Sequence, residues 1–515
     1  MRPEFQNEPF TDFSRPEAVA AQETALKLVE SKLGRTYPLV LGGRRITGGP
    51  TFDSLNPSNP KQVIGKFTQA TVEQAREAVG EAARAFESWR FMPWKERASV
   101  LFRVAGLMRR HRFELNAWMI LEVGKSWPEA DGDTAEAIDF CEFYAREALR
   151  YGGPQPITHV PGEANELEYI PLGVIAVIPP WNFPCAILAG MTGAAIVSGN
   201  AVVLKPSSDA PGIAWRTFEL FEEAGVPAGV LNFLTGGGAT VGNTIVEDVR
   251  TRAISFTGSR EVGLHINELA AKAPGGQKWI KRVVAEMGGK DFILVDREAD
   301  LEAAATGVCS AAFGFQGQKC SACSRAIVHQ DVYDEFLKLL VPRVQALKQG
   351  DVRDRSFNLG PVVNAKAEKS ILAYIEAGKK DGRLLYGGAK AAGEGYFIQP
   401  TVIADIPAGS KIEQEEIFGP VLAVIKARDF DHGVEIANGT DYGLTGSVYS
   451  RNRATLAKGR QLCHVGNLYL NRRCTGALVG VHPFGGFNMS GTDSKAGGRD
   501  YLLLFLQAKS ISESV

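Results

Sequence analysis

Short apolar runs alternate with segments of helical spacing between residues 169 and 271. The runs are Val174–Ile178, Ala201–Leu204, Leu231–Leu234 and Ala253–Phe256. The segments between and after them predict helices near residues 184–198, 211–224, 239–247 and 259–271. Short buried strands that alternate with helices are typical of a parallel, doubly wound sheet. A second alternating series begins at Phe292–Val295 and runs to about residue 470, which predicts a second α/β domain.

The first 150 residues are dominated by helical spacing. Residues 1–36 form a predicted arm with one helix near 15–33, because Ser14–Glu17 has the spacing of a capping box. The segment Leu39–Ile46 predicts a hairpin with a two-residue glycine turn. Further helices are expected from Thr71 onward and over about 94–123 and 134–150.

The length and charge of the chain limit the number of domains and the kinds of partner to be expected. At 515 residues the chain is too long for one hydrophobic core, so two or three domains are expected. Lys and Arg (57) nearly balance Asp and Glu (58), which argues against nucleic acid or an anionic membrane as the main partner. The uncharged stretch Ala186–Leu204 is broken by Ser198-Gly199-Asn200, so it predicts a buried helix, turn and strand rather than a transmembrane helix.

Seven cysteines in a chain of this length do not make a disulfide framework. They predict free thiols and a reducing, cytoplasmic location, and Met1–Phe5 shows no apolar signal segment. Cys320 and Cys323 form a C-x-x-C pair, which leaves open a dithiol redox site or half of a zinc site. No second pair has zinc-finger spacing, so no metal site is expected.

Two short segments suit covalent catalysis. Cys320 follows Gly317-Gln318-Lys319, and Lys319 together with a helix start is expected to lower the pKa of the thiol and favour the nucleophilic thiolate. Glu286 ends an apolar run and precedes two glycines, which permit close approach of a ligand. A carboxylate in that position can act as a general base that activates water.

A third segment, Pro179–Pro184, carries Asn182, whose amide could stabilise an oxyanion together with the backbone N–H of Cys320. The three segments together closely resemble the aldehyde dehydrogenase superfamily, and the resemblance runs from about residue 37 to the C-terminus. It implies that Cys320 attacks an aldehyde, that hydride passes to a nicotinamide to leave a thioester, and that Glu286 activates the hydrolytic water.

The resemblance also implies a fold and a domain division. The fold is α/β, with a Rossmann-type parallel-sheet cofactor domain, an α/β catalytic domain and a small β oligomerisation flap. A flap of this kind implies a homodimer or a larger homo-oligomer. The expected parts are residues 1–36 as an N-terminal helical arm, 37–150 and 170–285 as the NAD-binding domain, 286–490 as the catalytic domain, and 151–169 with 491–515 as the flap.

The implied cofactor is NAD. Lys205–Ser208 follows a strand and resembles the ribose site of the family, with Ser208 in place of a glutamate. A carboxylate there would repel a 2′-phosphate, so its loss predicts tolerance of NADP. Gly258-Ser259 at a helix start can offer N–H groups to a pyrophosphate. The resemblance assigns cofactor contacts to Pro180, Trp181, Lys205, Ser208, Gly238, Gly258, Ser259, Gly263, Gly288, Glu416 and Phe418.

The segment Arg473–Gly480, followed by His482–Gly486, resembles one branch of the family, the 1-pyrroline-5-carboxylate (L-glutamate γ-semialdehyde) dehydrogenases. The resemblance implies that the substrate is a small molecule whose carboxylate binds to the amides of two residues and to one serine. These are Gly476, Ala477 and Ser321, and Phe183 and Phe484 would sandwich the aliphatic chain. The product would be L-glutamate, from proline degradation. The chain lacks a proline dehydrogenase barrel, which implies the monofunctional form.

Three other functions stay open at this point. Another small anionic aldehyde such as succinate semialdehyde would need basic side chains on the anchoring segment rather than bare amides. An aldehyde dehydrogenase that acylates coenzyme A would lack a base like Glu286. If the chain were a dithiol redox protein or a binding protein, the motifs that resemble a dinucleotide-binding site would have no function.

Overall fold

The first series of apolar runs forms neighbouring parallel strands of a seven-stranded sheet in a computed structural model that describes residues 3–515. The predicted hairpin is confirmed, since its two strands pair antiparallel at one edge of the same sheet. Met1 and Arg2 of the predicted arm lie outside the described residues. In spatial order the strands are β11 (Arg282–Glu286), β10 (Thr251–Thr257), β7 (Val174–Ile178), β8 (Ala201–Leu204), β9 (Leu231–Phe233), β2 (Leu39–Leu41) and β3 (Arg44–Ile46).

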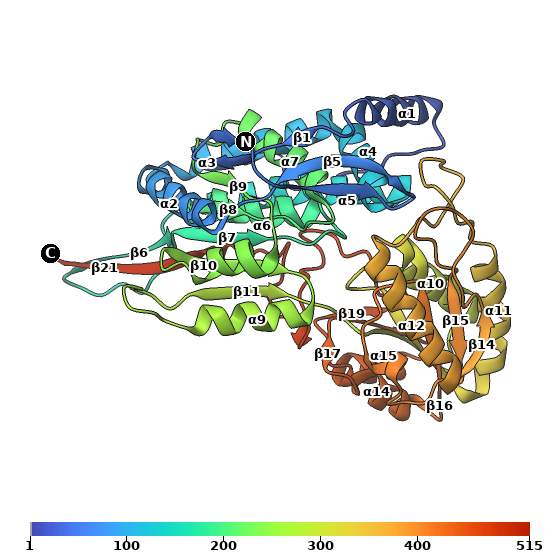
Figure 1. Ribbon diagram of the computed structural model, residues 1–515. Coiled ribbons are helices and arrows are strands. Elements are labelled where there is room, and N and C mark those ends of the chain that lie inside the picture. Colours follow the sequence, from blue (N-terminus) through green and yellow to red (C-terminus); the bar gives the residue numbers. More distant parts are fainter. Residues whose placement is uncertain (1–2) are drawn as a thin grey trace.

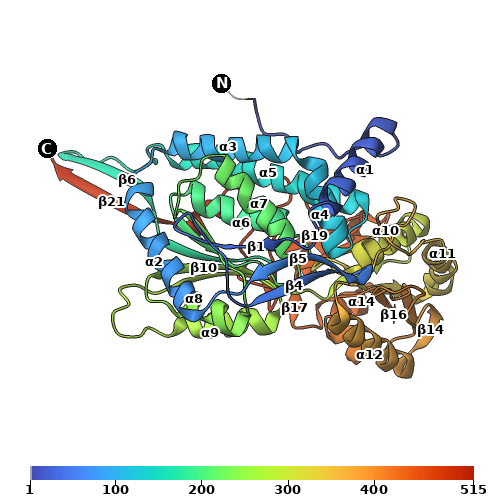
Figure 2. The same cartoon turned by 45° about the horizontal axis from the view of Figure 1, so that its top comes forward.

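Helices cover both faces of this sheet, so the doubly wound arrangement is confirmed (Figures 1 and 2). Ile175 and Val177 of β7 join the core beneath α3 to α7, whereas Val174 and Ala176 face α2, α8 and α9. We call this part of the molecule the first lobe. Its helices are α2 (Val72–Trp89), α3 (Trp94–Arg110), α4 (Arg112–Val123), α5 (Trp127–Tyr151), α6 (Ala186–Val197), α7 (Pro211–Glu223), α8 (Asn243–Glu247) and α9 (Arg260–Ala271).

The second series builds another seven-stranded sheet, which forms the second lobe (Figure 1). Ile293 and Val295 pack on the side of α10 and α11, and Phe292 and Leu294 pack on the side of α12 to α15. The strands are β14 (Arg383–Tyr386), β15 (Thr401–Ala404), β16 (Val421–Ala427), β13 (Cys323–His329), β12 (Asp291–Val295), β18 (Thr445–Tyr449) and β19 (Asn467–Leu470). The helices are α10 (Leu301–Phe313), α11 (Tyr333–Gln345), α12 (Ala365–Asp381), α13 (Lys411–Gln414), α14 (Phe430–Asn438) and α15 (Arg453–Leu462).

Three smaller sheets complete the fold. β6 (Glu163–Pro171) pairs antiparallel with β21 (Leu506–Ser514) over their whole length, and this ribbon projects from the first lobe with the C-terminus at its tip (Figures 1 and 2). The two strands lie largely in the two segments that were predicted to form the flap. The other two sheets consist of β1 (Thr36–Tyr37), β5 (Asn59–Thr68) and β4 (Thr51–Asn56), and of β17 (Tyr442–Gly443) with β20 (Phe487–Asn488).

The segment before β21 returns to the first lobe. Tyr501 stacks on Tyr144 of α5 with ring centroids 5.2 Å apart, and Leu502 and Phe505 are buried in the same core. The Nδ2 group of Asn200 donates to the carbonyl of Phe505 at 3.0 Å. Residues near the end of the chain thus complete the core that residues 98–233 begin.

Two helix starts differ from the sequence prediction. α1 (Pro16–Glu30) has no side-chain cap, and Ser14 Oγ donates to Asp12 Oδ1 at 2.6 Å, so the predicted capping box at Ser14–Glu17 is wrong. The expected start of a helix at 134 is also wrong, because α5 already begins at Trp127 with Pro128 in its first turn. At Thr71 the predicted helix start is confirmed, with a reciprocal capping box to Gln74.

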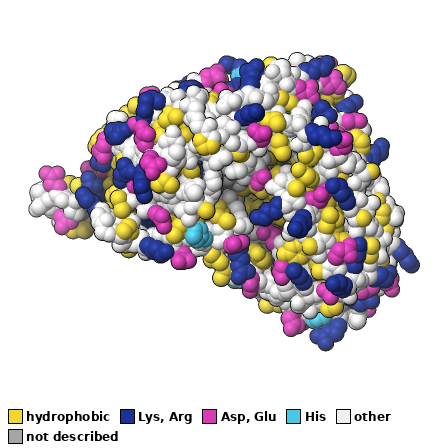
Figure 3. Space-filling view, viewed as in Figure 1, with side chains coloured by type: hydrophobic (Ala, Val, Ile, Leu, Met, Phe, Trp, Pro, Cys, Tyr) yellow, Lys and Arg dark blue, Asp and Glu magenta, His cyan; other side chains and the backbone are white. Residues whose placement is uncertain are grey.

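The uncharged stretch Ala186–Leu204 folds as α6, a turn and β8, as predicted. No helix within residues 3–515 is long and apolar enough to cross a membrane. Basic and acidic side chains alternate over the face seen in Figure 3, and no large area of one sign stands out. On this face, the mixture of charges agrees with the near-zero net charge of the sequence.

Candidate active site

The residues predicted to be catalytic come from two strand ends of the first lobe and one turn of the second. Glu286 is the last residue of β11, Asn182 follows β7, and Cys320 lies between the 3-10 turn Gly314–Gly317 and β13. A cavity of about 880 Å³ is lined by both Cys320 and Glu286. The fold therefore brings the two principal candidates to one ligand-sized space, at the sheet edge where doubly wound folds bind ligands.

The turn before Cys320 has an unusual backbone. Phe315, Gln316 and Gly317 all have positive φ (47°, 55° and 67°), a conformation that non-glycine residues adopt at a cost. The Gln316 side chain donates to the carbonyl oxygens of Gly124 and Pro361 at 3.2 and 2.8 Å, which holds the turn. A Cβ at Gly317 would collide with the carbonyl of Gly419, so this position requires glycine. The backbone just before the thiol is fixed by contacts from both lobes.

The expected activation of Cys320 by Lys319 and a helix start is wrong. Lys319 Nζ is engaged by Glu129 at 2.7 Å, and Cys320 follows a helix rather than beginning one. Burial raises the pKa of the Cys320 thiol well above its usual range, and the carboxylates of Asp291, Glu416 and Glu286 add to this shift. This environment disfavours the thiolate, so the thiol must lose its proton when it attacks.

Glu286 is half-buried and faces the cavity with one free oxygen. Its Oε1 accepts a hydrogen bond from Ser494 Oγ, whereas Oε2 has no partner among the described residues. Burial raises the pKa of Glu286 to about 7, and the two hydrogen bonds from Ser494 oppose that shift. A carboxyl with a pKa near neutrality and a free oxygen is suited to accept a proton from water.

Asn182 is buried beside the nucleophile turn. Its Nδ2 donates to the carbonyl of Gln318 at 3.2 Å, two residues before Cys320. The amide is therefore close to the predicted nucleophile, and one of its two N–H donors is already used. Stabilisation of an oxyanion by Asn182 stays a prediction.

The predicted cofactor residue Lys205, which follows β8, is a buried amine with spare hydrogen-bond donors. Lys205 is buried, its Nζ donates to the carbonyl of Pro206 at 3.1 Å, and burial lowers its pKa to about 8. An ammonium has three donors, so two remain for hydroxyl groups of a ligand such as a ribose. Ser208 is exposed, next to Asp209. These features fit the ribose of a dinucleotide.

The predicted pyrophosphate residues lie at the start of α9. Ser259 is its N-cap and accepts from the backbone N–H of Val262 at 3.4 Å. A Cβ on Gly263 would lie 2.5 Å from Met287 Sδ, so glycine lets α9 pack against the residue that follows Glu286. Around Gly238 no atom lies within 4 Å of the Cβ position, which leaves space there. The Gly258 N–H already donates to the carbonyl of Glu286 at 3.0 Å, so an anion at this helix start would be bound by the N–H groups that follow Gly258.

The predicted nicotinamide end lies between the lobes. Glu416 Oε1 accepts from the Gly289 N–H at 3.0 Å, and a Cβ on Gly288 would collide with the same carboxyl group. Trp181, which follows Pro180, packs edge-on against Phe418 with ring centroids 5.5 Å apart. The contacts bring these predicted cofactor residues together from both lobes.

All five predicted substrate residues line the cavity with Cys320 and Glu286. They are Phe183, Ser321, Gly476, Ala477 and Phe484. The Phe183 ring is supported from behind by Lys125, whose Nζ lies 4.0 Å from the ring centroid. The cavity thus combines aromatic walls with a glycine-rich rim.

In the segment Thr475–Gly480, which we call the anchor loop, two backbone N–H groups point away from Arg472. Arg472 donates to the carbonyl oxygens of Thr475 and Gly476 at 2.9 and 3.0 Å. No described peptide bond is cis, and the C=O and N–H of a trans peptide point in opposite directions. The N–H groups of Gly476 and Ala477 therefore point to the opposite side, where they are available to an anion.

A sequence profile of the aldehyde dehydrogenase family matches residues 46–511. The chain belongs to the aldehyde dehydrogenase family. A 1-pyrroline-5-carboxylate dehydrogenase of Geobacillus sp. (strain WCH70) is 56% identical over 509 residues, which cover 99% of each chain. Among solved structures, a Thermus 1-pyrroline-5-carboxylate dehydrogenase with bound NAD superimposes with a TM-score of 0.98 at 49% identity and covers 100% of both chains. A betaine aldehyde dehydrogenase of Staphylococcus aureus in complex with NAD+ has a TM-score of 0.89 at 28% identity, covering 96% of this chain and 97% of that one.

In this member of the aldehyde dehydrogenase family, the sequence interpretation missed a group of charged residues that face the cavity. Glu129, Asp133 and Glu136 of α5 line it, and Lys125 pairs with Asp133 at 3.0 Å. Burial, followed by the charge of Asp133, raises the pKa of Glu136 to about 8. The spacing of these acids along one helix was the available signal, but an acidic helix face usually lies in solvent.

Proposed function

We propose that the protein oxidises L-glutamate γ-semialdehyde, the open-chain form of 1-pyrroline-5-carboxylate, to L-glutamate with NAD or NADP in proline degradation. The observation that carries this proposal is the anchor loop, whose Gly476 and Ala477 line the same cavity as Cys320 and Glu286. The N–H groups of these two loop residues point away from Arg472 and have no hydrogen-bond partner among residues 3–515. The substrate has a carboxylate for those amides and an ammonium group for the acidic side of the cavity. The 1-pyrroline-5-carboxylate dehydrogenases that match this chain over its whole length support the same substrate.

Each end of the substrate has a counterpart in the cavity. The carboxylate would bind to the N–H groups of Gly476 and Ala477 and to the Ser321 hydroxyl, and Glu136, which lines the same cavity, would bind the ammonium group. A bound ammonium lowers the pKa of that carboxyl and favours its charged form. Phe183 and Phe484 pack on the chain between the two ends.

Catalysis is divided among three side chains. The Cys320 thiol releases its proton to water as its sulfur bonds to the aldehyde carbon, and Asn182 with the backbone N–H of Cys320 stabilises the oxyanion. Lys205, Ser259 and Glu416 would hold NAD(P), which would supply the hydride acceptor for oxidation of this adduct to a thioester. Glu286 then takes a proton from water, and the hydroxide releases glutamate from the sulfur.

The test is a comparison of three aldehydes with the purified protein and NAD, followed by NADH absorbance. 1-Pyrroline-5-carboxylate should have a kcat/KM about 100-fold or more above an uncharged aldehyde of equal length, since the uncharged aldehyde leaves buried polar groups unpaired. Succinate semialdehyde lacks the ammonium group and should fall between them. Preference for succinate semialdehyde would favour that alternative, and no reduction with any aldehyde would contradict the enzymatic proposal.

The rate of deacylation should depend on pH through Glu286. Its pKa is raised from the ordinary value of 4.5 to about 7, and the carboxylate is the active form. Steady-state kcat is therefore expected to be constant above about pH 8 and to fall by about tenfold per unit below about pH 6. A profile of kcat against pH checks this, and a rate that does not change between those values would show that Glu286 is not the base.

Cofactor choice should depend on residue 208. Ser208, three positions after Lys205, is exposed and carries no charge that would repel a 2′-phosphate. The substitution Ser208→Glu is expected to raise KM for NADP by about tenfold or more while KM for NAD changes by less than about threefold. Ser207→Glu, one residue earlier, is the matched control. An equal loss for both cofactors would contradict the placement of the ribose.

We further propose that the molecule is a homo-oligomer, at least a dimer, in the cytoplasm. β6 and β21 pair only with each other, in a ribbon that projects from the first lobe (Figure 2), so the outer edge of each strand is open. Open strand edges are usually covered by another part of a protein or by another chain. All seven cysteines are free thiols, which suits a reducing compartment. Light scattering that gave the mass of a single chain would contradict the oligomer.

A further inference from the structure

We propose that the N-terminal arm before α1 is a positioning element of the substrate site, and that Asn7 fixes the anchor loop in its amide-presenting conformation. The inference rests on the proposed function, because it concerns recognition of the same carboxylate. Asn7 Nδ2 donates to the carbonyl of Val479 in the anchor loop at 3.0 Å and to Asp139 Oδ2 of α5 at 2.8 Å. One side chain thus links the arm, the helix and the loop.

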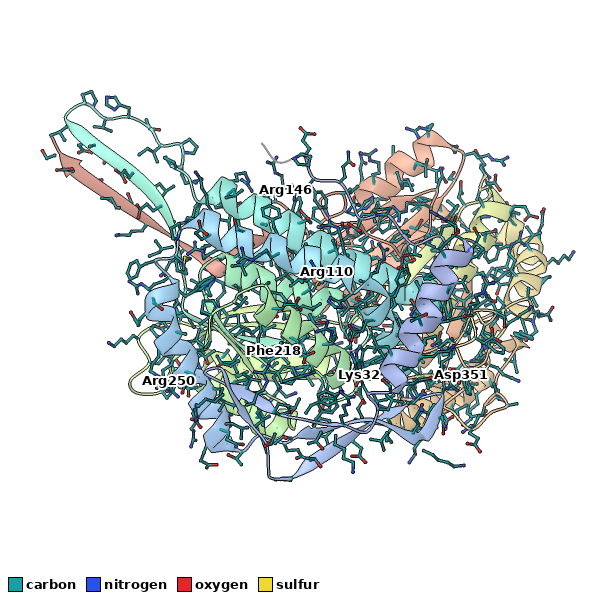
Figure 4. The ribbon with its side chains drawn as sticks, turned by 90° about the horizontal axis from the view of Figure 1, so that it is seen from above. Lys32, Arg110, Arg146, Phe218, Arg250 and Asp351 are labelled. Carbon is teal, nitrogen blue, oxygen red and sulfur yellow. The ribbon has the colours of Figure 1, made fainter. Side chains whose placement is uncertain are left out.

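The arm is held to the protein along its length. The backbone N–H of Glu8 donates to Asp139 Oδ1 at 2.7 Å, and both the backbone N–H and the hydroxyl of Thr11 donate to Asp131 at 2.7 Å. Arg146 of α5, labelled in Figure 4, donates to the carbonyl of Pro3 at 3.2 Å. Ordering an extended segment costs about 1–2 kcal/mol per residue, and these contacts offset that cost.

The arm also packs on the far end of the anchor loop. The Phe5 ring lies edge-on to Phe143 at 5.1 Å, and a Cβ on Gly480 would lie 3.1 Å from Phe5 and 3.0 Å from Phe143. Gly480 has a φ of 76°, which favours glycine, and the two rings cover it closely. Phe5 therefore restrains the residue at which the loop turns back.

The arm reaches the cavity itself. Glu8, Phe10 and Thr11 line the cavity, as do Gly476 and Ala477. Arg472 holds the carbonyls at one end of the anchor loop and Asn7 holds the carbonyl of Val479 near the other, so the two amides between them cannot rotate freely. Pre-organised donors of this kind bind an anion without a cost of ordering.

Asn7→Ala tests the inference, and Gln6→Ala, which changes the exposed neighbouring amide, is the matched control. In Asn7→Ala, KM for 1-pyrroline-5-carboxylate is expected to rise about fivefold to tenfold, the effect of one lost hydrogen-bonding side chain. We expect kcat, and KM for an uncharged aldehyde, to stay within about twofold because those depend on Cys320 and the aromatic walls. Gln6→Ala should behave as the wild type.

Hydrogen–deuterium exchange of the peptide that covers 475–480 provides a measurement independent of the substrate. The exchange rate should increase in Asn7→Ala and stay unchanged in Gln6→Ala, with equal melting temperatures for both variants. Unchanged exchange, or an equal rise of KM for charged and uncharged aldehydes, would overturn the inference. If the wild type showed no preference for 1-pyrroline-5-carboxylate, the proposed function would fail, and the exchange rates would still decide whether Asn7 positions the loop.

Discussion

Replacement of Cys320 by alanine is expected to abolish aldehyde oxidation, with kcat reduced by about 10⁴-fold or more for every substrate. The reason is chemical, because alanine cannot form the covalent adduct from which hydride departs. The turn that presents the thiol is held by Gln316 and the tight contact of Gly317 with Gly419, so the loss of one sulfur atom should leave the fold intact. NADH formation measures the activity of the variant, and a thermal melt of the same sample measures the stability of its fold.

Cys323→Ala is the control for this experiment, and it separates two chemistries. Cys323 is buried at the start of β13 and its Sγ contacts the carbonyl of Arg325 at 3.5 Å. A single nucleophile at Cys320 predicts that Cys323→Ala retains at least about half of the wild-type kcat. If both variants were equally inactive while remaining folded, the C-x-x-C pair would act as a dithiol, contrary to our proposal.

Replacement of Glu286 by glutamine should separate the two halves of the reaction. Acylation of Cys320 proceeds, but the amide cannot take a proton from water, so the thioester accumulates. We expect a rapid burst of about one NADH per active site, followed by a steady state about 10²- to 10⁴-fold slower than in the wild type. Stopped-flow absorbance measures the burst, and mass spectrometry of the quenched protein measures the acyl adduct.

Asp493→Asn provides a comparison for Glu286→Gln, since the same change from carboxyl to amide is made at a half-exposed position close by. Removal of that negative charge should lower the pKa of Glu286 slightly and leave kcat above pH 8 nearly unchanged. A Glu286→Gln variant that lost the burst as well as the steady state would assign Glu286 to acylation and not to release of the product.

The sequence was sufficient to predict those helices and strands whose local pattern of apolar residues agrees with their burial in the fold. The apolar runs that became β7 to β10 are buried on both faces, so their composition leaves little choice of structure. The β4–β5 hairpin was missed because its strands are half-exposed and contain Pro, Asn and Gly. The resemblance of short motifs to a known family, rather than periodicity, selected the residues of the candidate site.

Other properties of the site depend on partners that are distant in the chain. The pKa of Cys320 could not be predicted because it is set by burial and by Asp291, Glu416 and Glu286 together. Lys319, next to the thiol in sequence, is instead neutralised by Glu129, 190 positions away. Contacts such as that between Asn7 and Val479 are equally invisible without the fold.

The return of Tyr501, Leu502 and Phe505 to the first lobe has a consequence for biosynthesis. The ribosome completes the whole second lobe before it releases the residues that fill this part of the first core. A nascent chain therefore carries an open apolar gap beside Tyr144, and Asn200 lacks the acceptor that Phe505 provides. Contacts between residues this distant in the chain form slowly, and until they form the exposed apolar surface promotes aggregation. Truncation after Leu506 would leave these core side chains in place, whereas truncation before Tyr501 would remove them all and leave the gap permanently open.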